Sequence, residues 1–153
     1  MSEIVDSLYI VHNNAFLLSP LLKEFYINYH GQDKDILLSY LVLPLVLHEN
    51  TKITLKKSNV TSSLQTFGRN NDNYFGLPER VSEYKDITNK CLQYLIENGH
   101  IKINDKLSVE VSPKALGCDP SIKESKKSSK NLVKILRDYD IVTIYRLLGI
   151  KKL

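Results

Sequence analysis

The side chains that could carry chemistry are few and widely spaced in this chain. It has four histidines and two cysteines among 153 residues. No histidine has another four positions away, as a helical metal site needs, and two cysteines are too few for a cysteine-only metal box. Each histidine is therefore predicted to be a surface or edge residue and not a metal ligand. These residues are His12, His30, His48 and His100.

Sequence patterns typical of enzymes are absent as well. There is no glycine-rich phosphate loop, no nucleophile elbow and no pair of catalytic carboxylates. Glu79 and Glu83 are one helical turn apart, but the helix dipole favours acids in a first turn in any case. Cys91 falls on an apolar stripe and is interpreted as a small hydrophobic residue, and Cys118 lies in a loop. We expect a protein that is not an enzyme and binds no cofactor and no metal.

The main charge feature is a basic segment between Lys123 and Arg137. It contains six basic residues and one acid, so it carries a net charge of +5 while the rest of the chain is near −1. Three interpretations compete: contact with DNA, contact with an acidic face of a partner, and a solvated linker. We favour the linker, because residues 121–130 include one apolar side chain in ten. The candidate contact residues are Lys123, Lys126, Lys127 and Lys130.

Length and composition predict a single domain over residues 1–153. The chain is 42% hydrophobic and 25% charged, as in ordinary globular proteins. Its start is acidic, without the basic and apolar regions of a secretion signal, and no apolar run reaches membrane length. We therefore expect a soluble, cytoplasmic protein without membrane contact.

An apolar stretch over residues 36–47 is the predicted centre of the core. It carries no charge, so it is expected to be a helix buried on every face, with a kink or an end near Leu43 because of Pro44. Residues 20–30 show helical spacing as well, and Ser19 before Pro20 looks like a start signal. Together these segments predict a helical hairpin over residues 13–48, with Asn14 able to cap its start.

Residues 52–111 follow the element order of a winged helix. The prediction is a short edge strand, a short helix, a helix of about twenty residues and a β-hairpin. In the hairpin, a three-residue loop would pair Ile103 with Leu107 and Ile101 with Val109. The predicted ranges are Lys52–Lys56, Thr61–Gly68, Pro78–Asn98 and Ile101–Val111.

The long helix of this unit is not basic, since it displays four acids against three bases. Phosphate binding needs a clear excess of lysine and arginine, so we interpret the unit as a protein-binding module. A helix and hairpin without the winged-helix topology is the alternative. Residues 112–129 are predicted to be a flexible basic linker and residues 130–149 to form C-terminal helices, one of them capped by Asp140. The predicted fold is mainly α with a small β-hairpin, an α+β class.

Two blocks of sequence resemble one family. The first is Asn13-Asn14-Ala15-Phe16 followed by residues 41–51, Leu-Val-Leu-Pro-Leu-Val-Leu-His-Glu-Asn-Thr, and the second is residues 141–150, Ile-Val-Thr-Ile-Tyr-Arg-Leu-Leu-Gly-Ile. At this chain length they resemble the middle component of bacterial three-component ABC systems, including Lamassu-type defence operons. The chain departs from the family at Asn14, where proline is usual. The motif residues, which also look structural, are Asn14, Leu43, Pro44, Leu45, His48, Tyr145, Leu147, Leu148 and Gly149.

The resemblance implies a role and not a reaction. It implies a small non-catalytic adaptor that joins an SMC-like ABC ATPase to an effector, often a nuclease, acting against phage or plasmid DNA. The protein would then contact DNA mainly as part of the assembled complex. The alternative function is a stand-alone winged-helix transcriptional regulator that binds a defined DNA site.

Overall fold

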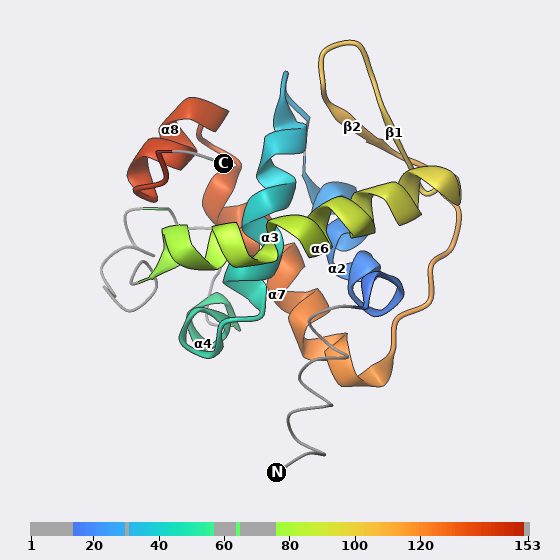
Figure 1. Cartoon of the computed structure of the whole chain (residues 1–153), viewed down its shortest axis with the longest axis horizontal. Helices are drawn as coiled ribbons and strands as arrows, with labels where there is room; N and C mark the ends of the chain where they lie inside the picture. The colour runs from blue at the N-terminus through green and yellow to red at the C-terminus, as the bar shows by residue number, and fades with distance from the viewer. Residues whose placement is uncertain (1–13, 30, 57–63, 65–75, 152–153) are drawn as a thin grey trace.

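A computed structural model describes residues 14–29, 31–56, 64 and 76–151 (Figure 1). The fold is mainly helical with one small antiparallel hairpin, which confirms the predicted α+β class. In chain order the elements are α2 (Ala15–Asn28), the 3-10 helix η1 (Asp35–Leu38), α3 (Ser39–Val46), α4 (Glu49–Lys56), α6 (Leu77–Glu97), β1 (Ile101–Ile103), β2 (Val109–Val111), the 3-10 helix η3 (Pro120–Ile122), α7 (Lys123–Leu136) and α8 (Ile141–Leu147).

Helix α3 lies at the centre, as its unbroken apolar sequence predicted. It packs against α2, α4, α6 and α7, and α6 crosses in front of it in Figure 1. Pro44 lies inside this eight-residue helix, which ends at Val46 and is preceded by η1. The predicted single helix over residues 36–47 is therefore a 3-10 turn followed by a short α-helix. Tyr40 reaches the edge of the core, where its hydroxyl donates to Asn89 Oδ1 at 2.6 Å.

Helix α2 runs unbroken past Pro20, so the prediction of a second helix start there is wrong. Asn14 caps the helix, with its side-chain oxygen accepting from Leu17 N at 3.0 Å. Ser19 does not act as a cap, since its hydroxyl donates back to the Ala15 carbonyl one turn earlier. This i−4 bond is the usual way that a serine inside a helix satisfies its hydroxyl.

The predicted edge strand at residues 52–56 is wrong, because this segment belongs to helix α4. Thr51 and Leu55, four positions apart, are both buried, whereas Ile53 is 48% exposed. That is helical burial and not strand alternation. The next predicted element, Thr61–Gly68, lies outside the described residues except for Leu64. With its first strand replaced by a helix, the winged-helix order is not confirmed.

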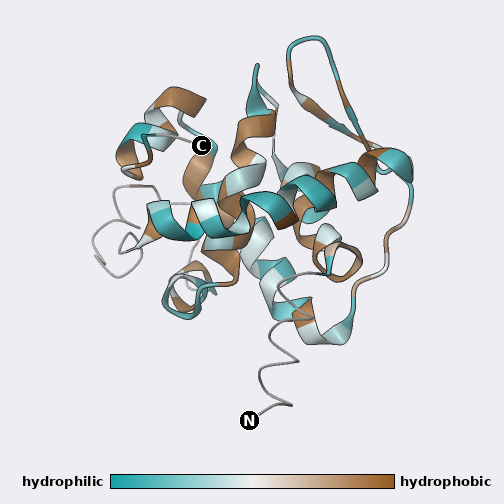
Figure 2. Ribbon diagram, viewed as in Figure 1, coloured by the Kyte–Doolittle hydropathy of each residue, from teal (hydrophilic) through white to brown (hydrophobic). Residues whose placement is uncertain are grey.

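Helix α6 confirms the predicted long helix to within a residue at each end. Cys91, predicted to lie on an apolar stripe, is buried in it, and hydrophilic and hydrophobic residues alternate along the helix in Figure 2. Arg80 ties it to α3, with its Nε donating to the Pro44 carbonyl at 3.3 Å. The buried residues of α6 are Leu77, Val81, Ile87, Thr88, Cys91, Leu92 and Leu95.

The hairpin forms, but the predicted register is wrong by two residues. Ile103 pairs with Val109 and Ile101 with Val111, so the loop spans residues 104–108. The Asn104 side chain stabilises this longer loop by accepting from Lys106 N and Ser108 N at 2.9 and 3.1 Å. A shift of two residues keeps the apolar side chains on one face, so hydrophobic patterning could not distinguish the two registers.

The predicted linker over residues 112–129 is wrong in its second half, because η3 and α7 occupy residues 120–136. Helix α7 packs against α2, α3 and α4 through a row that begins with serines and continues with aliphatic residues. Serine counts as polar in a sequence pattern, yet its small side chain lets two helices approach closely. The buried residues of α7 are Ser125, Ser128, Ser129, Leu132, Val133, Ile135 and Leu136.

We compared the length and apolar composition of the described helices with those needed to cross a membrane. No single one of them is long and apolar enough to cross a bilayer. Asp35–Val46 and Glu49–Lys56 together reach the required length and composition, but they are bent by 101° relative to each other.

Candidate functional site

The first block of motif residues lies mostly inside the core. Asn14 caps α2, and the three residues at the centre of the block are buried in α3. His48 follows α3 and lies at the edge, with its Nδ1 3.0 Å from Thr51 Oγ1. The three buried residues are Leu43, Pro44 and Leu45.

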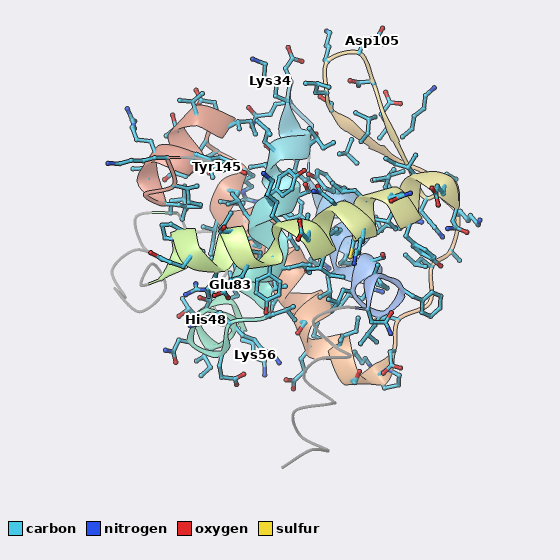
Figure 3. The ribbon with its side chains drawn as sticks, viewed as in Figure 1. Lys34, His48, Lys56, Glu83, Asp105 and Tyr145 are labelled. Carbon is cyan, nitrogen blue, oxygen red and sulfur yellow. The ribbon has the colours of Figure 1, made fainter. Side chains whose placement is uncertain are left out.

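The second block anchors the C-terminal helix α8. The predicted cap forms, since Asp140 Oδ1 accepts from Thr143 N at 2.7 Å. The Tyr145 hydroxyl donates to the Leu37 carbonyl and so ties α8, where Figure 3 labels Tyr145, to the 3-10 helix η1. Leu148 is buried, Gly149 adopts a positive φ of 75° that favours glycine, and Leu147 remains 39% exposed. Apart from Leu147, these residues hold the fold together.

The predicted contact lysines lie on a helix and not on a linker. Lys123, Lys127 and Lys130 follow steps of four and three, which Lys134 continues, so the four share one face of α7. The first three are exposed and Lys134 is half-buried. Among the described residues none of the four forms an ion pair with an acid. We call these four residues the lysine face.

Lys126 stands apart from the lysine face. It lies on a neighbouring row of α7, and its Nζ is 3.9 Å from Glu24 Oε2 on α2. Glu124, the acid within the segment, pairs with α4 instead, at 3.1 Å from Lys56 Nζ and 3.6 Å from Lys52 Nζ. The hydrogen bond and charge of Lys56 lower the pKa of Glu124. The structure thus separates Lys126 from the other three candidate lysines.

A cavity of about 610 Å³ opens beside α2, β2 and residues 112–116. Its walls combine apolar and charged side chains from three parts of the chain. Sequence reasoning did not predict this site, because its residues are far apart in the sequence. The lining charged residues are Lys23, Glu24, Lys114 and Lys126.

Lys23 is the unusual residue of this cavity. It is only 4% exposed, and no described acid forms an ion pair with it. Its Nζ lies 2.9 Å from His100 Nδ1 and also donates to the Lys114 carbonyl. Because an ammonium can only donate, His100 Nδ1 must accept, and the ring proton is on Nε2. The pair therefore joins a lysine to a neutral histidine.

The surroundings lower the pKa of both partners. Burial, followed by the charge of Lys114, lowers the pKa of Lys23. Burial, followed by the charges of Lys23 and Lys114, lowers the pKa of His100. The environment thus disfavours a charge on either side chain, and the histidine in particular is held in the neutral form.

The prediction that His100 is a surface or edge residue is wrong, since it is only 3% exposed. Nothing in the sequence around this histidine signals its burial. Its partner did carry a signal: Lys23 lies three residues after Pro20 and three before Tyr26, and both are buried. A lysine on the apolar row of a helix could have indicated a buried cation.

Acidification is expected to destabilise the fold through His100. The pKa of His100 lies below its ordinary 6.5 in the folded protein, so its stabilising contribution is present above pH 6.5. It is lost as the pH falls below 6.5, because the unfolded chain then binds the proton more readily, by up to about 1.4 kcal/mol per pH unit. Urea unfolding at pH 7.5 and 5.5 measures this loss. His100→Gln should reduce it and His48→Gln should not; an unchanged loss in His100→Gln would contradict the assignment.

No site for a metal was found in the part of the chain that the structure describes. Within it, no three histidine, cysteine, aspartate or glutamate residues come together to hold an ion. Cys91 is buried, which raises the pKa of its thiol to about 11 and keeps it protonated at neutral pH.

Comparison with known proteins places the chain in a family. The model of one family, described as ABC-three component (ABC-3C) system Middle Component 3, matches residues 2–152. Neither the curated proteins nor the solved structures gave a match. The family match spans nearly the whole chain and agrees with the resemblance carried by the two motif blocks. This chain therefore belongs to the Middle Component 3 family of ABC-three component systems.

Proposed function

We propose that this protein is a non-enzymatic, cytoplasmic adaptor in a Lamassu-type antiviral defence complex. It would join an SMC-like ABC ATPase to an effector of the nuclease type, which acts on phage or plasmid DNA. The observation that carries the proposal is the family match over residues 2–152, since a middle component has partner components by definition. A non-enzymatic component that assembles with the other components of such a system would act as an adaptor between them.

The use of buried polar groups supports a scaffold role. The hydroxyl of Tyr26 donates to the Asp35 carbonyl at 2.7 Å, and that of Tyr145 donates to the Leu37 carbonyl. Burial raises the pKa of both tyrosines, so they remain neutral hydrogen-bond donors. Both tyrosine hydroxyls donate to backbone carbonyls of their own chain. Their raised pKa values are therefore explained by the fold, without a role in binding a substrate.

Co-expression with the two neighbouring components tests the proposal. The tagged chain should retain both the ATPase component and the effector through affinity purification and size-exclusion chromatography. The isolated chain should hydrolyse neither ATP nor DNA, while the assembled complex should do so. Failure of the wild-type chain to retain either component, or nuclease activity of the chain alone, would overturn the adaptor role.

The lysine face favours a second candidate function, direct contact with DNA held by the ATPase. Lys123, Lys127, Lys130 and Lys134 point from one face of α7 and have no acidic partner among the described residues. A row of unpaired cations along a helix can follow a line of phosphates, and each contact releases counterions. The α6 helix lacks this excess of basic residues.

Changing the lysine face to glutamine is expected to reduce the salt dependence of DNA binding by the assembled complex. If all four lysines contact phosphates, the slope of log K against log salt should fall by about 3 to 4. The matched control changes Lys85, Lys90, Lys102 and Lys106 to glutamine and removes the same charge elsewhere. An unchanged slope with all subunits still associated would exclude DNA contact, and loss of a subunit would instead indicate a protein interface.

A further inference from the structure

The cavity beside α2 holds a buried cation, Lys23, that no acid among the described residues neutralises. Lys23 has three N–H donors, and the structure gives it two acceptors, His100 Nδ1 and the Lys114 carbonyl. Both acceptors are uncharged, and no described carboxylate forms an ion pair with the ammonium. Burial of an ammonium without an anion costs free energy. The remaining donor belongs to a side chain that lines the cavity.

The charges around the cavity add to this imbalance. Three lysines and one glutamate line it, which gives a formal charge of +2. Glu24 lies 3.9 Å from Lys126 and offsets that lysine. The Lys114 ammonium instead donates to the Asn98 carbonyl at 2.6 Å and forms no ion pair with a described acid. The excess positive charge thus comes from Lys23 and Lys114. A ligand that fits this cavity should be an anion.

The edge of β2 points to a peptide as the carrier of that anion. Ser112 N donates to the His100 carbonyl, so residues 100 and 112 form a hydrogen-bonded pair of the antiparallel ladder. The alternation of such pairs directs the backbone N–H and C=O of Val111 away from β1. Val111 lines the cavity, so these two groups can pair with an extended backbone laid along it, whereas Val109 N on the same edge already donates to Asp35 Oδ1.

Apolar side chains complete the wall. Ile27 is 56% exposed on α2 and lines the cavity together with Val111 and Leu116. An extended segment alternates its side chains between two faces, so it can place an acidic group on Lys23 and an apolar one against this wall. Free phosphate would satisfy the lysines but would use neither the apolar wall nor the β2 edge.

We propose that this cavity is the docking site for an acidic extended segment of a partner subunit, whose aspartate or glutamate carboxylate binds Lys23. The proposal rests on the adaptor role proposed above and names the chemistry of one of its interfaces. It also gives a role to a buried lysine whose two acceptors in the structure are uncharged.

Two substitutions test the docking site, one by removing its buried cation and the other by changing its apolar wall. Lys23→Met removes the cation and keeps the aliphatic stem, and Ile27→Glu adds a negative charge at a wall position that is 56% exposed. Each should weaken binding of the chain to one purified partner component, the ATPase or the effector, by at least tenfold at 100 mM salt. The matched controls are Lys90→Met and Ile53→Glu, which make the same changes at exposed sites on α6 and α4.

The outcomes separate the two proposals. If the wild-type chain binds neither component, the adaptor role fails. If the wild type binds and both Lys23→Met and Ile27→Glu bind within twofold of it, the docking site fails while the adaptor role stands. Thermal unfolding of each variant alone checks its fold; should Lys23→Met not fold, Ile27→Glu alone decides the result. Weakening by the control variants to the same extent would also overturn the docking site.

Discussion

Replacing Asp35 with alanine is expected to lower the free energy of unfolding by about 2–4 kcal/mol at pH 7. This aspartate is fully buried, and its two carboxylate oxygens accept from Val109 N at 2.8 Å and Gln32 N at 3.1 Å. Hydrogen bonds to a charged group contribute about 1.5–3 kcal/mol each, and alanine would leave the buried Val109 N–H and the partly buried Gln32 N–H without this acceptor.

The effect is large because Asp35 is the centre of a contact between two distant segments. Lys34 N and Ile36 N donate to the Lys106 and Leu107 carbonyls at 2.8 and 3.1 Å, so the hairpin loop runs beside residues 34–36. Figure 3 shows Lys34 and Asp105 at the same end of the molecule. Loss of the carboxylate should therefore loosen the hairpin tip as well as the start of η1.

Asp35→Asn is the matched variant, because it keeps the shape of the side chain. Its single carbonyl oxygen can accept from one N–H group while its amide faces the other, so it should recover only part of the lost stability. Urea unfolding of both variants at pH 7 measures the difference. A loss below about 1 kcal/mol in Asp35→Ala would show that water replaces the carboxylate as an acceptor.

The pH dependence of this loss has a definite sign. Burial raises the pKa of Asp35 above its ordinary 3.8, despite the two backbone hydrogen bonds that lower it. The contribution of Asp35 is therefore fully present below pH 3.8 and decreases as the pH rises through the folded-state pKa. The difference between wild type and Asp35→Ala should accordingly be larger in mild acid than at pH 7.

Enlarging Ser129 to leucine is expected to cost about 3 kcal/mol, whereas shortening it to alanine should stabilise the protein by about 1 kcal/mol. Ser129 is fully buried on α7, and its hydroxyl has no hydrogen-bond partner among the described residues. Alanine removes the unsatisfied hydroxyl and keeps the small volume. Leucine would push α7 away from its neighbours in a core that tolerates extra volume poorly.

Thermal and urea unfolding of the two variants measure these opposite effects. Lys130→Leu, a substitution to the same residue at the exposed neighbouring position, is the control for helix propensity and should change stability little. Equal stability of Ser129→Leu and wild type would show that space remains beside α7. A destabilised Ser129→Ala would show that water satisfies the hydroxyl.

The elements that the sequence predicted well are those specified by neighbouring residues. The α6 stripe and the Asp140 cap of α8 each depend on side chains within a few positions of one another. The α4 segment was wrongly predicted to be a strand because Ile53 and Leu55 are separated by one residue. This spacing fits a short strand as well as the end of a helix. The first half of α7 was predicted as a linker because its buried row begins with three serines.

The candidate docking site could not be predicted from the sequence, for a related reason. Lys23 is 77 positions from His100 and 91 from Lys114, and Asp35 is 74 from Val109. Each contact joins a side chain to a partner that only the folded chain brings near. Sequence spacing finds helix faces and caps, but it cannot find the acceptor of a buried lysine. The family, by contrast, could be predicted, since the resemblance rested on two short blocks of residues.

The packing of α2 against α7 has a consequence for the order of events during synthesis. Helix α2 begins at Ala15 and α7 at Lys123, roughly a hundred residues later. At about 5–20 residues per second, the ribosome takes several seconds to make that stretch, and the apolar row of α2 lacks this cover until then. The nascent chain is therefore a natural client for chaperones, and early translation of a partner subunit that binds α2 would shorten its exposure.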